Sequence, residues 1–410
     1  MELAAEPALG YMGPTDLPFD HDDVRVYIDN LFLEGYLKPC PAADYGQHPE
    51  YTDLPEWLRV GLRIAPEADR IRRVEGLLAS IAASVPSAEA RHHDWLAFAH
   101  RWAALLAVWH QFSPAVQPPL TQRFHEVREH IDVTFLTWVQ QRYGGLHNLP
   151  AAQPAMLHHI PRYLARELDT PGVEKVALVV LDGLACDQWV VLREILVQQR
   201  PQLHYQEAAV FAWIPTITSV SRQAAFAGKP PVYYPGSIHR TDKETTLWTQ
   251  FWSDHGLSQT EVAYARGLSQ GSDLPTVEVR LAHPKVRVVG LVVDAVDKIM
   301  HGMTLGTAGM HNQMRQWAAE GFLARLLDLL FDHSYAVFLT SDHGNIECVG
   351  RGRPSEGAVA DLRGERVRVY PDPVLRAQVR ARFPDALAWP ALGLPENYFP
   401  LLAPRRFAFV

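Results

Sequence analysis

Apolar residues follow two different patterns along this chain, and the change between them divides it into two parts. Over residues 56–168 they recur at spacings of three and four, which places each set on one face of a helix. The sets are Ile71, Val74, Leu78 and Ile81; Trp95, Phe98, Trp102, Leu105 and Trp109; and Leu120, Phe124, Val127, Ile131, Phe135 and Trp138. The pattern predicts an α-helical N-terminal region at residues 1–170, with a further short helix at residues 24–37.

Beyond residue 170 the pattern becomes an alternation of short apolar runs and helical stretches. Strands are predicted at residues 176–181, 208–214, 288–293 and 335–340, and helices at residues 186–199 and 310–331. The runs are continuous, as in strands buried on both faces, so an α/β domain with a doubly wound, mostly parallel sheet is expected. The stretch at about 229–285 follows neither period, and we expect it to form an insertion above the sheet edge.

Composition narrows the classes of protein without selecting one. The 410 residues carry a formal net charge of −8, which gives no overall basic signature for nucleic acid but leaves a local basic patch open. Cys40, Cys186 and Cys348 are too few and too widely spaced for a disulfide framework or a cysteine-rich zinc module. Neither an export signal nor a long apolar run is present, so a cytoplasmic protein without a membrane segment is expected.

Polar residues follow each predicted strand. They are Asp182 and Gly183; the run from Pro215 to Ser219, which enters a predicted helix ending at Gly228; Asp294, Asp297 and His301; and Ser341, Asp342, His343 and Gly344. Taken singly, such residues most often form turns or helix N-caps. Together they favour a site, because the carboxyl ends of parallel strands meet at one edge of a sheet, where ligands bind. On a helical turn, Asp297 and His301 would face the same point.

Several carboxylates in one cleft would repel each other unless a cation compensates them. Carboxylate oxygens and imidazole nitrogens without a thiolate suit zinc, with manganese as the alternative. Two such ions could stabilise both oxygens of an in-line displacement, and a threonine hydroxyl on one of them would become a nucleophile. For Arg222, one helical turn after Thr218, two interpretations stay open: a contact to phosphate, or a surface or helix-capping role.

These motifs, in this order, resemble the metal-site motifs of the alkaline phosphatase superfamily. The segments Leu-Asp-Gly-Leu-Ala-Cys-Asp-Gln-Trp and Pro-Thr-Ile-Thr-Ser-Val-Ser-Arg most resemble the PglZ domain of BREX-type phage-defence systems, over residues 171–410. The resemblance implies that Thr218, the second threonine of the run, is the nucleophile. It also implies one metal bound by Asp182, Thr218, Asp342 and His343, and another bound by Asp297 and His301.

The resemblance further implies a third ligand to the second metal, from a histidine near the end of the domain, but His343 is the last histidine of the sequence. Either the domain is truncated at its C-terminus or the second metal site is incomplete. Two hypotheses follow. The first is a metal-dependent phosphohydrolase of a phage-defence system, acting on phosphate monoesters or on diesters that include nucleic acid. The second is a catalytically weak or inactive scaffold of the defence complex. By resemblance, the partners are a methyltransferase and ATPases, with DNA left open.

Overall fold

The computed structural model describes residues 2–3, 37–38, 40–41, 62–63, 66–111, 118–354 and 360–410. The chain divides into two compact units, one with residues 1–85 and 114–127 and the other with residues 86–113 and 128–410. The helix expected at residues 24–37 lies outside the described residues, apart from Leu37. The elements of the first unit are α3 (Pro66–Ala83), the beginning of α5 (Pro118–Arg142), and the short strands β1 (Glu2–Leu3), β2 (Leu37–Lys38), β3 (Cys40–Pro41) and β4 (Leu62–Arg63).

The three long helices predicted from apolar spacing are present, as α3, α4 (His92–Trp109) and α5. In the second unit, the tryptophans of α4 and α5 belong to the core. Trp95 is 4% exposed and Trp138 is fully buried, and their ring centroids lie 6.2 Å apart. The Nε1–H of Trp138 donates to the carbonyl of Ala90 at 2.8 Å, which satisfies its polar atom inside the core.

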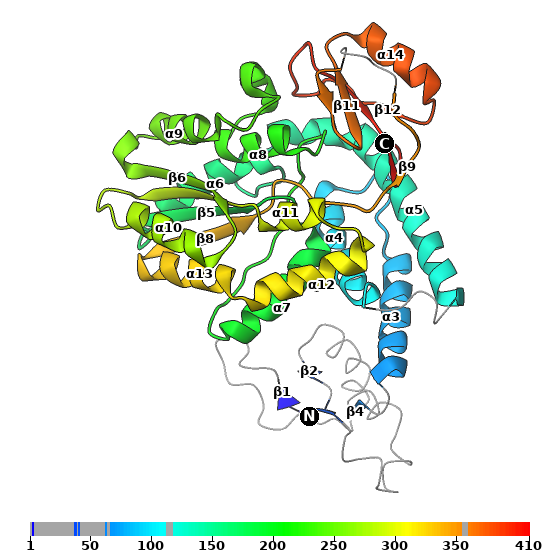
Figure 1. Ribbon diagram of the computed structural model, residues 1–410, viewed down its shortest axis with the longest axis horizontal. Helices are drawn as coiled ribbons and strands as arrows, with labels where there is room; N and C mark the ends of the chain where they lie inside the picture. Colours follow the sequence, from blue (N-terminus) through cyan, green and yellow to red (C-terminus); the bar gives the residue numbers. More distant parts are fainter. Residues whose placement is uncertain are drawn as a thin grey trace, which may run out of the picture. The chain divides into compact units, whose positions relative to one another are not determined.

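The second unit is built on a parallel sheet with the strand order β6–β7–β5–β8, of which Figure 1 labels β6, β5 and β8. The strands are β5 (Lys175–Leu181), β6 (Val262–Leu268), β7 (Val288–Val293) and β8 (Tyr335–Thr340). The two central strands, β5 and β7, are almost entirely buried, as their continuous apolar runs predict. The predicted fold class, an α/β domain with a mostly parallel sheet, is confirmed.

Helices cover both faces of this sheet (Figure 1). One face carries α6 (Ile160–Leu168), α8 (Thr218–Ala227) and α9 (Glu244–Asp254), and the other carries α7 (Cys186–Gln199), α10 (Leu274–Leu281), α12 (Gly306–Ala319) and α13 (Phe322–Asp332). Gly290 of β7 allows α8 and α9 to pack closely on the sheet. A Cβ atom at this position would lie 2.9 Å from the ring of Phe226 and 3.2 Å from that of Trp248.

The structure corrects the predicted strand at residues 208–214. This segment does not join the sheet: the N–H of Phe211 donates to the carbonyl of Ala155 at 2.9 Å, and the carbonyl of Phe211 accepts from Leu157 N–H at 3.1 Å. The edge position is taken instead by β6, which lies inside the stretch expected to be an insertion. The predicted helix at residues 310–331 is two helices, α12 and α13, separated at Gly321, whose φ is 75°.

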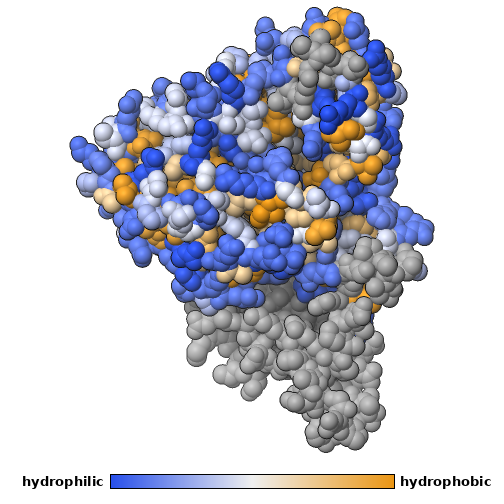
Figure 2. Space-filling model, in the orientation of Figure 1, coloured by the Kyte–Doolittle hydropathy of each residue, from blue (hydrophilic) through white to orange (hydrophobic). Residues whose placement is uncertain are grey.

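A smaller antiparallel sheet lies near the end of the chain, with the strand order β10–β11–β13–β12. Its elements are β10 (Leu362–Arg363), β11 (Val367–Tyr370), α14 (Pro373–Arg382), β12 (Leu387–Ala388) and β13 (Phe399–Leu402). The final apolar run contributes β14 (Phe407–Ala408), which pairs in parallel with β9 (Val349–Gly350). On the face drawn in Figure 2, hydrophobic residues form small groups among hydrophilic ones. None of the described helices is long and apolar enough to cross a membrane.

His158 is held neutral inside the second unit. Its side chain is buried, its Nε2–H donates to the carbonyl of His147 at 3.1 Å, and its Nδ1 accepts from the Nε1–H of Trp213 at 3.2 Å. The two bonds together fix the tautomer. Burial, reinforced by the neighbouring His159, lowers the pKa of His158 to about 3.

We therefore expect stability to fall as the solution is acidified. Between the ordinary histidine pKa and the folded value of about 3, the unfolded chain binds a proton at His158 that the folded chain does not. His158 should therefore lower the free energy of unfolding by ~2 kcal/mol between about pH 7 and about pH 5. Urea unfolding at these two pH values measures it. His158→Gln should reduce the pH dependence, whereas His130→Gln, at an exposed position of α5, should not. Equal pH dependence in the two variants would contradict this account.

Candidate metal and phosphoryl-transfer site

The residues that follow β5, β7 and β8 meet at the carboxyl edge of the central sheet. Backbone hydrogen bonds continue the sheet just past the strands, since the N–H of Asp182 donates to the carbonyl of Val293 at 2.9 Å. Gly183 follows with a φ of 73°, a conformation that favours glycine, and the chain turns there towards α7. Asp342 links the segments that follow β5 and β8, because its Oδ1 accepts from the N–H groups of Gly183 and His343, each at 3.0 Å.

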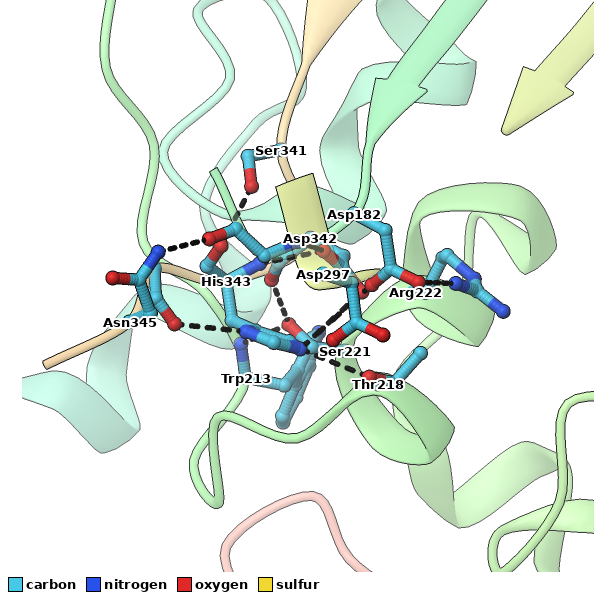
Figure 3. Close-up of polar contacts among 12 residues, drawn as sticks. Asp182, Trp213, Thr218, Ser221, Arg222, Asp297, Ser341, Asp342, His343 and Asn345 are labelled. Atoms are coloured by element: carbon cyan, nitrogen blue, oxygen red, sulfur yellow. Dashed lines mark hydrogen bonds and ion pairs between the residues drawn. The ribbon is translucent and has the colours of Figure 1, made fainter. Parts of the chain in front are cut away.

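Asp182, Asp342 and His343 form a compact cluster, drawn in Figure 3. One ligand atom from each residue can be chosen so that all lie within 4.8 Å of one another. The Nε2 of His343 lies 4.0 Å from Asp182 Oδ1 and 3.6 Å from Asp342 Oδ2. The side chains that follow β5 and β8 therefore lie together at one point, and their role as metal ligands stays a prediction.

Thr218 joins the cluster from the first position of α8. Its Oγ1 lies 3.0 Å from His343 Nε2. Ser221, on the next turn of α8, accepts from the N–H of Trp213 at 3.0 Å and donates to the carbonyl of Asp342 at 2.6 Å. This serine fixes the start of α8 against the loop after β8, so that the Thr218 hydroxyl faces the carboxylates (Figure 3).

In its neutral form, His343 presents a lone pair to the cluster. Its Nδ1 lies 2.9 Å from the carbonyl of Gly344, a contact that requires Nδ1 to carry the proton. The other ring nitrogen, Nε2, is then an acceptor that points towards Asp182, Asp342 and Thr218. This is the tautomer that a metal-binding histidine needs, with its remote N–H oriented by a backbone carbonyl.

The cluster fits a divalent cation. Asp182 Oδ1 and Asp342 Oδ2 are buried and accept no hydrogen bond from the described residues. Such orphaned carboxylate oxygens are costly unless a positive charge compensates them. Burial, with a further contribution from Asp342, raises the pKa of Asp182 to about 8, even though Arg222 opposes the shift. A hard or borderline cation bound by two carboxylates, a histidine nitrogen and a hydroxyl would remove this penalty.

Asp297 and His301 lie on α11 (Ala295–His301), one helical turn apart as predicted, and they are more exposed than the cluster. Asp297 Oδ1 is 3.4 Å from His301 Nε2, and their side chains are 27% and 71% exposed. Asp297 borders the cluster, because a Cβ atom on Gly183 would lie 3.9 Å from its Oδ1. Asp294, at the N-cap of α11, pairs with Lys298 at 2.8 Å. Among the described residues, no third His, Cys, Asp or Glu completes a metal-binding group with Asp297 and His301.

Arg222 is not on the surface, which was one interpretation left open by the sequence. It is 6% exposed and lies between two carboxylates: its Nη1 bonds to Asp182 Oδ2, and its Nε donates to Glu244 Oε1 at 2.8 Å.

Sequence reasoning missed Glu244 and Ser221. It also missed Asn345, whose Nδ2–H donates to the carbonyl of Gly183 at 2.7 Å. In the sequence, Ser221 and Asn345 lie within or next to a recognised motif, and Glu244 lies in the stretch before β6.

The fold and the cluster together define an alkaline-phosphatase-like α/β domain, a class that generally uses divalent metals. Residues 160–410 match the family model of the BREX system PglZ alkaline phosphatase-like domain. The match covers more than half of the chain and begins at α6, before the boundary expected at residue 171. The chain belongs to the PglZ family, as its motifs predicted, and so to a multi-protein defence system. No curated protein matches the chain.

Divalent metal should stabilise the folded chain through this cluster. A ligand that binds only the native state at about 100 times its Kd adds ~2.7 kcal/mol. We expect Zn²⁺ or Mn²⁺ to raise the Tm in a thermal-shift measurement, and His343→Ala to abolish the rise. His333→Ala is the matched control, because His333 lies just before β8, at the opposite edge of the sheet. A rise that His343→Ala leaves intact would place the metal elsewhere.

Proposed function

We propose that this PglZ protein is a metal-dependent phosphohydrolase that acts on phosphate mono- or diesters and uses Thr218 as its nucleophile. The observation that carries the proposal is the position of the Thr218 hydroxyl. It lies 3.0 Å from His343 Nε2, at the first residue of a helix, beside two buried carboxylate oxygens that lack a partner among the described residues. A surface threonine in a capping role would not need such surroundings.

Each residue has a part in the proposed reaction. Thr218 Oγ1 would lose its proton and attack phosphorus in line with the leaving oxygen, whose bond to phosphorus breaks and which takes up a proton. Water would then hydrolyse the phosphothreonine, which releases the phosphoryl group and restores the threonine hydroxyl. The N-terminus of α8 favours negative charge, so the N–H groups of its first residues are suited to the transferred phosphoryl oxygens. Asp182, Asp342, His343 and Thr218 would hold one ion. Zinc, or alternatively manganese, would supply Lewis-acid stabilisation of charge that develops on oxygen.

A scaffold role within the defence system is the second candidate. It is favoured by the second pair, Asp297 and His301, which is open to solvent and has no third ligand among the described residues. A chain of this kind would bind an ion in the buried cluster and turn over slowly or not at all. In either role, we propose that the partners are a methyltransferase and ATPases of the same system, with DNA left open as a further partner.

Turnover separates the two candidates. Purified protein with Zn²⁺ or Mn²⁺ should hydrolyse a nitrophenyl phosphate monoester or diester. Thr218→Ala and Asp342→Ala should each lower the rate by roughly 10³-fold or more, since they remove the nucleophile or a buried ligand. The measurement is the release of nitrophenol under saturating metal.

Thr216→Ala is the matched control for the nucleophile. Thr216 belongs to the same run but is exposed, and its loss should leave the rate close to that of the unaltered chain. If metal binds and neither ester is hydrolysed, the scaffold candidate is favoured. Equal rates for the Thr218→Ala and unaltered chains would assign the nucleophile to another group.

A further inference from the structure

A chain of buried polar contacts reaches Asp182 from the side opposite to the cluster. Tyr264 of β6 donates its hydroxyl to Glu244 Oε2 at 2.5 Å, and Glu244 Oε1 accepts from Arg222 Nε at 2.8 Å. Arg222 Nη1 then bonds to Asp182 Oδ2. Glu244 is 1% exposed and Arg222 is 6% exposed, so this is an interior network that links β6, α9 and α8 to the end of β5.

The two carboxylate oxygens of Asp182 have different surroundings in this network. Oδ2 is taken by the guanidinium, whereas Oδ1 faces His343 and accepts no hydrogen bond from the described residues. In Figure 3, Asp182 lies between Arg222 on one side and His343 on the other. A carboxylate held in this way has one oxygen left for a metal ion.

Charge alone would not favour a guanidinium at this position. A fixed cation next to a metal ligand repels a divalent ion and competes with it for the carboxylate. Glu244 offsets this effect, because its buried carboxylate faces the same guanidinium. Burial by itself would lower the pKa of Arg222, but Glu244 and Asp182 raise it above its ordinary value, so the guanidinium keeps its charge. Arg222 then contributes to the site by orientation, since its planar guanidinium fixes the direction of each carboxylate that it binds.

We infer that Arg222, oriented by Glu244 and Tyr264, is a positioning residue that occupies one oxygen of Asp182 and directs the other towards a single divalent ion. This inference deepens the proposed function and rests on its metal site, but it does not depend on turnover. It gives the Arg222 guanidinium a role in preparing the site rather than in binding phosphate.

The test is the affinity of the full chain for Zn²⁺, measured by competition with a chelating dye at fixed pH. If Arg222 acted only through its charge, Arg222→Met would remove a repulsive cation and tighten Zn²⁺ binding. If Arg222 positions Asp182, the same change should weaken Zn²⁺ binding by about 10- to 100-fold, as the loss of a group that orients a ligand usually does. Arg222→Lys restores a cation without the planar fork and should give an intermediate affinity.

Lys243→Met is the matched control, because it removes a nearby positive charge whose side chain is 52% exposed and adjoins Glu244 in sequence. It should leave Zn²⁺ affinity unchanged or slightly tighter. Circular dichroism without metal checks that each variant folds. If Arg222→Met does not fold, Arg222→Lys is used alone. Weaker Zn²⁺ binding by Arg222→Lys then supports the inference, and unchanged binding overturns it. Equal or tighter binding by folded Arg222→Met also overturns it. A failure of the unaltered chain to bind either Zn²⁺ or Mn²⁺ would overturn both proposals. If the variants bind metal more weakly but the unaltered chain hydrolyses neither ester, only the phosphohydrolase proposal fails.

Discussion

The parallel pairing of β5 with β7 and β8 is the constraint on which the whole site depends. In this register Val180 lies opposite Val292 on one side and Thr340 on the other, so all three strands end together. The next residues of each chain segment must therefore share one edge of the sheet, and Asp182 occupies its centre. A slip of one residue would move each side chain of β5 to the opposite face, so the register is held by the shape of the close-packed core on each face rather than by a difference in polarity between the faces. Hydrophobic packing thereby fixes where the charged groups lie.

The central strands could be predicted because β5 and β7 are buried on both faces and read as unbroken apolar runs. The edge of the sheet could not be predicted in the same way. The strand β6 contains Arg266 and Gly267, which are exposed and lie just before its last residue, Leu268, so its sequence lacks the continuous run that marks a central strand. Residues 208–214 have an apolar run of similar length but pair with residues 155–157. Which of the two segments takes an edge is decided by tertiary packing, and local sequence carries little of that information.

The positions of the buried candidate ligands could be predicted for a related reason, since Asp182, Asp342 and His343 lie within three residues of the end of a strand and Thr218 begins a helix. The supporting groups could not. Arg222 and Asp182 are 40 positions apart, and Arg222 and Glu244 are 22 positions apart, on elements whose contact depends on how α8 and α9 pack over β7. A buried arginine and a buried glutamate read as surface residues in a sequence, because charged residues are rarely buried unless they are paired. Only the folded chain shows that they pair.

The two halves of the site differ in burial, and this difference bears on the choice between an enzyme and a scaffold. Asp182 and Asp342 lie in the interior, where attraction to a cation is strong, whereas Asp297 is only half-buried and His301 is exposed to solvent, which screens charge. Thr218 contacts the buried half, so activation of the nucleophile would depend on the better-formed part of the site. If the proposed reaction also uses the exposed pair, a weak pair would slow it without moving the nucleophile, so α11 is the element at which an enzyme and a scaffold of this fold would differ.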